Sequence, residues 1–124
     1  MDLKEYFENT RGIGVMATAD TDGQVDAAIY ARPHIMEDGL LAFIMRDRTT
    51  HANTLANPRA TYLFKEEGPG YKGKRLYLTK VREEEDAELI KHLSRRNYQS
   101  DENSKEATFL VYFKVDKERP LIGD

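Results

Sequence analysis

Three consecutive residues near the middle of the chain, Arg48, Thr49 and Thr50, combine a cation with two hydroxyl groups. They stand between two apolar segments, 40–46 and 59–66, at the point where a helix is expected to begin. A guanidinium group can bind a phosphate through paired hydrogen bonds, and the amides of a first helical turn also favour an anion. These residues therefore indicate a site for a terminal phosphate. The alternative is a surface helix that a threonine caps, beside an arginine with no special role.

A second group of candidates lies in segment 24–36, whose alternation predicts one long strand. One face of that strand carries Asp26, Ala28, Tyr30, Arg32 and His34, and the other carries Val25, Ala27, Ile29 and Ala31. We expect the second face to belong to the core. The first face suits a flat ring that lies against the backbone at Ala28 and accepts a hydrogen bond from Arg32. A strand face exposed to solvent is the alternative.

Metal and thiol chemistry find little support in the composition. The chain has no cysteine, which excludes disulfides, thiolate metal sites and thiol nucleophiles. Its three histidines, His34, His51 and His92, do not show the spacing of a metal-binding helix, so structural or surface roles are expected for them.

The length of 124 residues predicts a single domain, residues 1–124. The net charge of −3 gives no general electrostatic reason to bind nucleic acid or an anionic membrane. No apolar run approaches the roughly 20 residues of a membrane span, and the first ten residues are too charged for a secretory signal. We therefore expect a cytoplasmic protein.

The elements that must hold the candidate residues follow from periodicity and turn signals. Helices are expected at 2–9 with Asp2 as its cap, after Arg48, and at 82–96; strands are expected at 13–19, 24–36, 40–46, 59–66, 74–81 and 107–115. Pro33 must lie at an edge or beside a bulge. In the last strand, Phe109, Val111, Phe113 and Val115 share one face. The expected fold is mainly β, of the α+β class, with six antiparallel strands in a small barrel.

From Ile13 onward, the sequence resembles the pyridoxamine 5'-phosphate oxidase-like family of FMN-binding split β-barrels. The resemblance lies in the order and spacing of its parts. The stretch "GVMATADTDGQVDAAIYARPHIMEDGLLAFIMRDRTTHANTLANPRATYLF" is similar to that family's strand, D-x-x-G turn, long flavin-contacting strand, D-G turn, apolar strand, phosphate loop and N-P-R sequence. The stretches "KGKRLYLTKVREEEDAELIKHL" and "TFLVYFKVDKERPLIGD" resemble the following strand and helix and the closing strand and tail.

The resemblance implies a six-stranded antiparallel split β-barrel with a short N-terminal helix, a short phosphate-loop helix and one longer helix. It implies a homodimeric FMN-binding oxidoreductase that acts on an unidentified small molecule, with the cofactor at the subunit interface. The phosphate would lie near Arg48, Thr49, Thr50 and His51, and the flavin ring along Ala28, Ile29, Tyr30, Ala31 and Arg32.

Two questions stay open at this point. The same fold could hold a deazaflavin or haem, or could serve as a flavin-binding module without turnover. Tyr71 and Arg75, next to the loop 67–73, could cover the cofactor or belong to an ordinary loop and strand. The polar segment 97–106 carries no recognisable chemistry.

Overall fold

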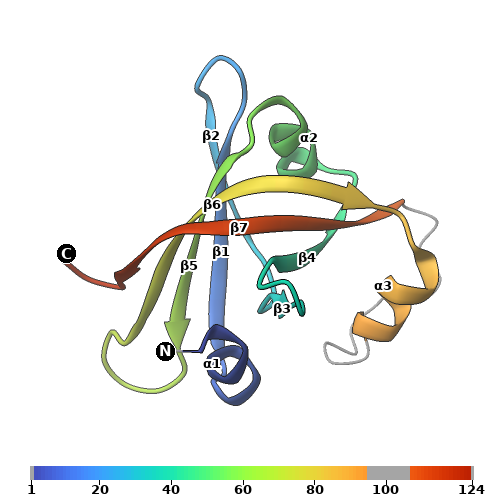
Figure 1. The fold of residues 1–124 in the computed structure, drawn as a ribbon. Helices are drawn as coiled ribbons and strands as arrows, with labels where there is room; N and C mark the ends of the chain where they lie inside the picture. Colours follow the sequence, from blue (N-terminus) through green and yellow to red (C-terminus); the bar gives the residue numbers. More distant parts are fainter. Residues whose placement is uncertain (1, 95–106, 124) are drawn as a thin grey trace.

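The computed structural model describes residues 2–94 and 107–123, which form one seven-stranded sheet and three helices (Figure 1). The helices are α1 (Leu3–Asn9), α2 (Thr49–Ala56) and α3 (Ala87–Ser94), and the strands are β1 (Gly12–Ala19), β2 (Val25–Ile29), β3 (His34–Ile35), β4 (Leu41–Arg46), β5 (Arg59–Glu66), β6 (Gly73–Glu84) and β7 (Thr108–Pro120). The strand order is β2-β1-β5-β6-β7-β4-β3, and every neighbouring pair is antiparallel. The described helices have seven or eight residues, well short of the length that a bilayer span requires.

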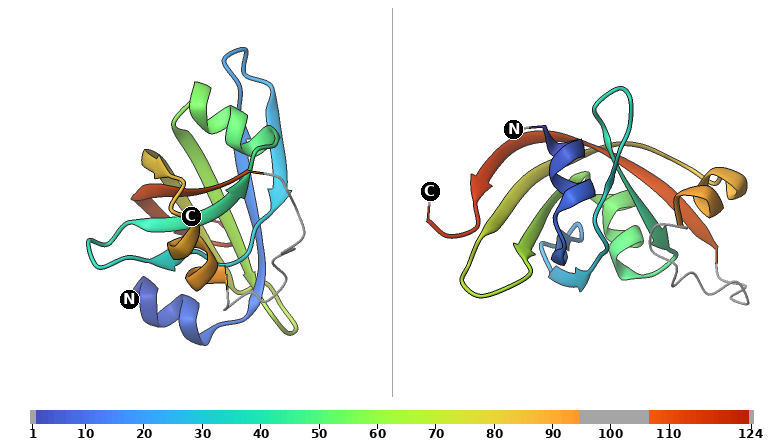
Figure 2. Two further views of the ribbon diagram at one scale, coloured as in Figure 1. Left: turned by 90° about the vertical axis from the view of Figure 1, so that its right-hand side faces the viewer. Right: turned by 90° about the horizontal axis from the view of Figure 1, so that it is seen from below.

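The sheet is curled because its two edge strands follow each other in the chain. A flat sheet of this size would place its edges roughly 29 Å apart, whereas the chain from Ile29 to His34 reaches at most about 18 Å. The sheet must therefore bend until β2 and β3 approach each other. The right-hand view of Figure 2 shows this curvature, with β6 and β7 arching over the rest of the barrel. The chain itself joins the two edge strands, but β2 and β3 are not hydrogen-bonded to each other as neighbours in the sheet.

The prediction of six strands was wrong by one, because the long second strand divides in two. Its parts, β2 and β3, are separated by residues 30–33. Pro33 has no N–H to donate to a ladder, and it lies in this break as its chemistry requires. The interruption ends the regular alternation after Ile29 and lets the chain pass from one edge of the sheet to the other.

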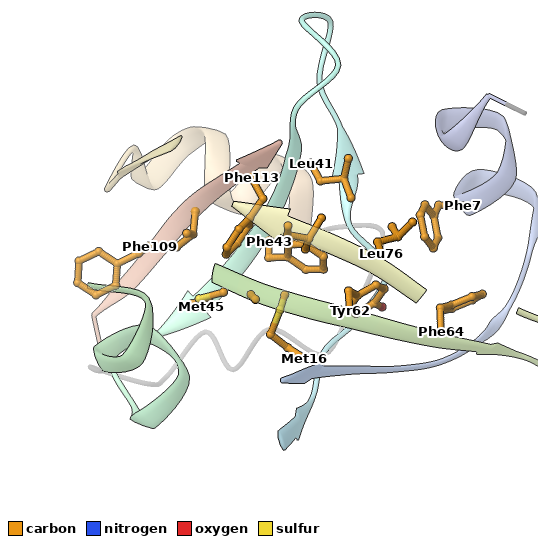
Figure 3. Close-up of a cluster of buried hydrophobic side chains, with 13 residues drawn as sticks. Phe7, Met16, Leu41, Phe43, Met45, Tyr62, Phe64, Leu76, Phe109 and Phe113 are labelled. Carbon is orange, nitrogen blue, oxygen red and sulfur yellow. The ribbon is translucent and has the colours of Figure 1, made fainter. Parts of the chain in front are cut away.

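The core fills the inside of the curled sheet with aromatic side chains (Figure 3). Tyr62 and Phe43 lie at its centre, with their ring centroids 4.9 Å apart. Phe7 from α1 closes one end and packs edge-on against Phe64 at 5.2 Å. The predicted inward face of the last strand is confirmed: Phe109, Val111 and Phe113 are buried and Val115 packs against them.

The prediction that Val25, Ala27, Ile29 and Ala31 face the core was wrong. Val25 and Ile29 are 70% and 71% exposed. The cause is the pairing of β2 with β1, which sets Ala28 opposite the fully buried Met16 and so turns the alternate residues outward. Alternation defines two faces of a strand, but the partner strand decides which one points inward.

The predicted helix at 82–96 begins later than expected. Residues 82–84 continue β6 and pair with 110–112 of β7, so the helix starts at Ala87. The side chain of Asp86 accepts a hydrogen bond from the amide of Leu89 at 3.0 Å, which stabilises this start. The expected end at residue 96 lies outside the described residues. β7 likewise runs to Pro120, beyond the expected end at residue 115.

Candidate functional site

An open cavity of about 590 Å³ lies where β2, β4 and the first turn of α2 meet. Its lining residues are Asp26, Ala27, Ala28, Ile29, Tyr30, Ala31, Ile44, Arg46, Arg48, Thr49 and Thr50. The fold thus brings together segments 28–31 and 48–50, which are distant in the sequence. Of the predicted site residues, only Arg32 and His51 do not line this cavity.

The structure does not place a threonine at the N-cap of α2. Arg48 is the N-cap residue, while Thr49 and Thr50 are the first two helical residues, so the alternative of a helix that a threonine caps was wrong. A guanidinium group has no acceptor for the amides of a first turn, and its positive charge opposes the positive end of the helix dipole. An anion at this turn would relieve both effects.

Tyr30, one of the lining residues, links the end of β2 to α2. Its amide donates to the carbonyl of Gly14 at 2.9 Å, and its carbonyl accepts from the hydroxyl of Tyr62 at 3.0 Å. Burial raises the pKa of the Tyr30 phenol, although a hydrogen bond with Thr50 and the charge of Arg48 act in the opposite direction. The phenol therefore stays neutral near pH 7, and the backbone beside the cavity is held in place.

A close approach at Gly14 permits this arrangement. A Cβ atom at that position would lie 1.8 Å from the Tyr62 hydroxyl oxygen, so no side chain fits there without a shift of the tyrosine. Glycine at this position therefore lets Tyr62 reach the carbonyl of Tyr30.

His51 belongs to the first turn of α2 but does not line the cavity. Its side chain is buried, and its two ring nitrogens contact carboxylate oxygens of Asp47 and Glu83. Asn53, two residues further along, donates to the hydroxyl oxygen of Thr18 in β1 at 3.0 Å. These contacts anchor α2 to the barrel.

The remaining candidates lie away from the cavity. Arg32 donates from Nη1 to the carbonyls of Phe7 and Thr10, at 2.6 and 3.0 Å, at the end of α1. Tyr71 is 72% exposed in the loop between β5 and β6, and Arg75 donates to carbonyl groups of the C-terminal segment. The segment 97–106 lies outside the described residues.

Sequence reasoning missed Arg46, which lies at the end of β4 and lines the cavity together with Arg48. The signal was available in the sequence R-D-R at 46–48. At the end of an extended segment, residues two apart lie on the same side, so both arginines can approach the same ligand.

Within the described residues, no cluster of histidine, aspartate and glutamate side chains could hold a metal ion.

Comparison with solved structures identifies the fold. The chain superimposes on an FMN-binding protein from Syntrophomonas wolfei with a TM-score of 0.79 and 16% identity, over 99% of this chain and 86% of that one. An F420 reductase aligns with a TM-score of 0.69 and 19% identity, over 93% and 94% of the two chains. A Listeria innocua protein, named as a proposed pyridoxamine 5'-phosphate oxidase, aligns with a TM-score of 0.68 and 18% identity, over 94% and 93%.

The chain has the pyridoxamine 5'-phosphate oxidase-like split-barrel fold. No protein-family model and no curated protein matches the sequence, so this assignment depends on the three-dimensional likeness. At these identities the likeness shows the architecture alone. The chemistry of this split-barrel protein must be argued from the cavity itself.

Proposed function

We propose that this split-barrel protein binds FMN in the cavity between β2, β4 and α2 and acts as a flavin-dependent oxidoreductase on a small molecule. The observation that carries the proposal is the N-cap of α2. Arg48 occupies a position where a side-chain acceptor or a negative charge is favoured, and it supplies neither. A bound phosphate supplies both and accepts hydrogen bonds from the guanidinium group.

The rest of the cavity fits a flavin attached to that phosphate. Its volume of about 590 Å³ is in the range of small-molecule sites. The small side chains of Ala28 and Ala31 allow a flat ring to approach the backbone of that segment. Arg46 adds a second positive charge at the end of β4. The fold likeness to a protein named as FMN-binding supports the same choice of cofactor.

The contribution of the chain is to bind and orient. A bound flavin supplies hydride or electron transfer. Arg48 and the first turn of α2 hold the phosphate, and Tyr30 keeps the adjacent backbone in a single position through its bonds to Gly14 and Tyr62. The positive charges of Arg46 and Arg48 favour negative charge on a ligand in the cavity.

The proposal includes a homodimer with the cofactor at the subunit interface. Val25 and Ile29 expose most of their surface on the outer face of β2, and neighbouring Ile13 of β1 is 61% exposed. Ile29 also lines the cavity. A second copy that covers this apolar face would therefore also close one side of the cofactor site.

A deazaflavin is the second candidate cofactor. The fold likeness to an F420 reductase favours it, because that protein is named for a deazaflavin. The absorption spectrum and mass of the chromophore that copurifies with the native protein distinguish the two cofactors. A non-catalytic module would bind the same chromophore but would not pass electrons from it to any small molecule.

The phosphate site is tested by titrating FMN and riboflavin into the wild type and Arg48→Ala. A hydrogen bond to a charged group contributes roughly 1.5 to 3 kcal/mol, so FMN should bind Arg48→Ala about tenfold more weakly or worse. Riboflavin lacks the phosphate and should bind both proteins alike. Arg11→Ala, an exposed arginine outside the cavity, is the matched control. Equal losses for both ligands in Arg48→Ala would contradict the phosphate site.

A further inference from the structure

His51 makes three specific contacts although only 3% of its surface is exposed. Its ring stacks on Phe109 of β7, with centroids 4.0 Å apart and planes 12° apart. Nδ1 lies 3.0 Å from an oxygen of Asp47, and Nε2 lies 3.0 Å from both carboxylate oxygens of Glu83. Every polar atom of the imidazole ring is thus engaged.

Both polar partners of this ring are carboxylates. An ionised carboxylate can only accept hydrogen bonds, so each ring nitrogen must carry a proton to bond both partners. Burial raises the pKa of the Glu83 carboxyl, but bonds from Lys80 and His51 outweigh burial and leave that pKa below its usual range. Two carboxylates, an imidazolium and the ammonium of Lys80 then form a chain with balanced charge.

The two carboxylates come from different parts of the fold. Asp47 directly precedes the N-cap of α2, His51 is the third helical residue, and Glu83 belongs to β6. The Asp47–His51 contact therefore joins the residue before Arg48, Thr49 and Thr50 to the residue after them. The His51–Glu83 contact joins that turn to the barrel.

We propose that His51 is a positioning residue for the phosphate-binding turn. This inference rests on the proposed function. His51 does not line the cavity, and it acts on the ligand by holding Arg48 and the first amides of α2 in their observed orientation. Loss of the imidazolium frees the turn to move, so the affinity for a phosphate falls while the affinity for the flavin ring is kept.

The test measures the ratio of FMN to riboflavin affinity in the wild type, His51→Gln, Arg48→Ala and the double variant. We expect His51→Gln to lower this ratio roughly fivefold to tenfold, and the double variant to lose little more than Arg48→Ala alone, because both changes act on one turn. Riboflavin affinity should change less than about twofold, which separates positioning from a general loss of folding.

Glu83→Gln provides a variant that keeps the shape of the bridge and removes one charge. It should lower the FMN to riboflavin ratio in the same direction as His51→Gln, and it carries the test if His51→Gln does not fold. An unchanged ratio in these variants, or losses that add to that of Arg48→Ala, would overturn the inference and leave the proposed function intact. A wild type with no preference for FMN over riboflavin would instead overturn the proposed function, and this inference with it.

Discussion

Two residues at the start of α2 place polar groups where a helix end or a protein core does not ordinarily hold them. Arg48 places a cation at the positive end of a helix, and His51 buries an imidazole that contacts two carboxylates. Departures of this kind from local preference are typical of functional sites. Both residues belong to the same turn. A ligand with a phosphate would bind at Arg48, and His51 would hold the turn that binds it.

Glu83 leads to a prediction about acid stability. Its pKa in the folded protein lies below the ordinary value of 4.5, so the ionised carboxylate stabilises the fold above that pH. This stabilisation is lost as the pH falls through the folded-state value. Glu83→Gln should therefore melt at a lower temperature than the wild type at pH 7, and the difference should shrink below about pH 4.5. Thermal melts across this range measure it, and a difference that stays constant with pH would contradict the prediction.

Elements at opposite ends of the barrel are held by different means. α1 begins at the predicted cap, where Asp2 accepts from the amide of Lys4 at 2.9 Å, and it buries Phe7 in the core. The buried side chains of α2 are polar instead, and they bond to the barrel through Asn53 to Thr18 and through His51 to Glu83. An apolar contact tolerates small shifts, whereas directed hydrogen bonds define the orientation that a ligand site needs.

Arg32 tests the attachment of α1. Its guanidinium group donates to the carbonyls of Phe7 and Thr10, which lack partners within the short helix. Arg32→Ala should reduce the free energy of unfolding of the protein without cofactor by about 1.5 to 3 kcal/mol. Denaturant unfolding measures this change, with Arg11→Ala as the control. A stable Arg32→Ala with an altered flavin potential would instead support the contact with the flavin ring that the family resemblance implies.

The whole molecule leaves an apolar outer face beside its candidate site. Val15 and Leu63 lie opposite each other on β1 and β5, and Val15 also pairs with the exposed Ile29 of β2. An exposed sheet face of this kind commonly marks a protein interface. Ile29 belongs both to this face and to the lining of the cavity, so association and ligand binding should be linked.

Dimer formation is tested with a charge on that face. Light scattering of the wild type should give about twice the chain mass of 14.3 kDa. Val25→Lys should give a monomer that binds FMN more weakly, because a buried lysine without a partner is unfavourable and the cavity loses one side. Val81→Lys, at a half-exposed apolar residue of β6, is the control. A wild-type monomer that binds FMN fully would contradict the shared site.

The sequence by itself was enough for features that depend on neighbours along the chain. The cap at Asp2, the end-to-end agreement of β5 with segment 59–66 and the buried face of Phe109 and Phe113 all follow from local periodicity and capping chemistry. The same local reasoning placed a helix after Arg48. The family resemblance added the split barrel, which the solved structures show.

Only the tertiary structure decided features that depend on pairing between distant segments. The register with Met16 turned Val25 outward, and pairing with β7 extended β6 through Glu84. That extension also carried Glu83 to His51, which lies 32 residues earlier in the chain. Periodicity shows that a strand has two faces, but the identity of its neighbours determines which face is buried and which side chains meet, and that information is non-local.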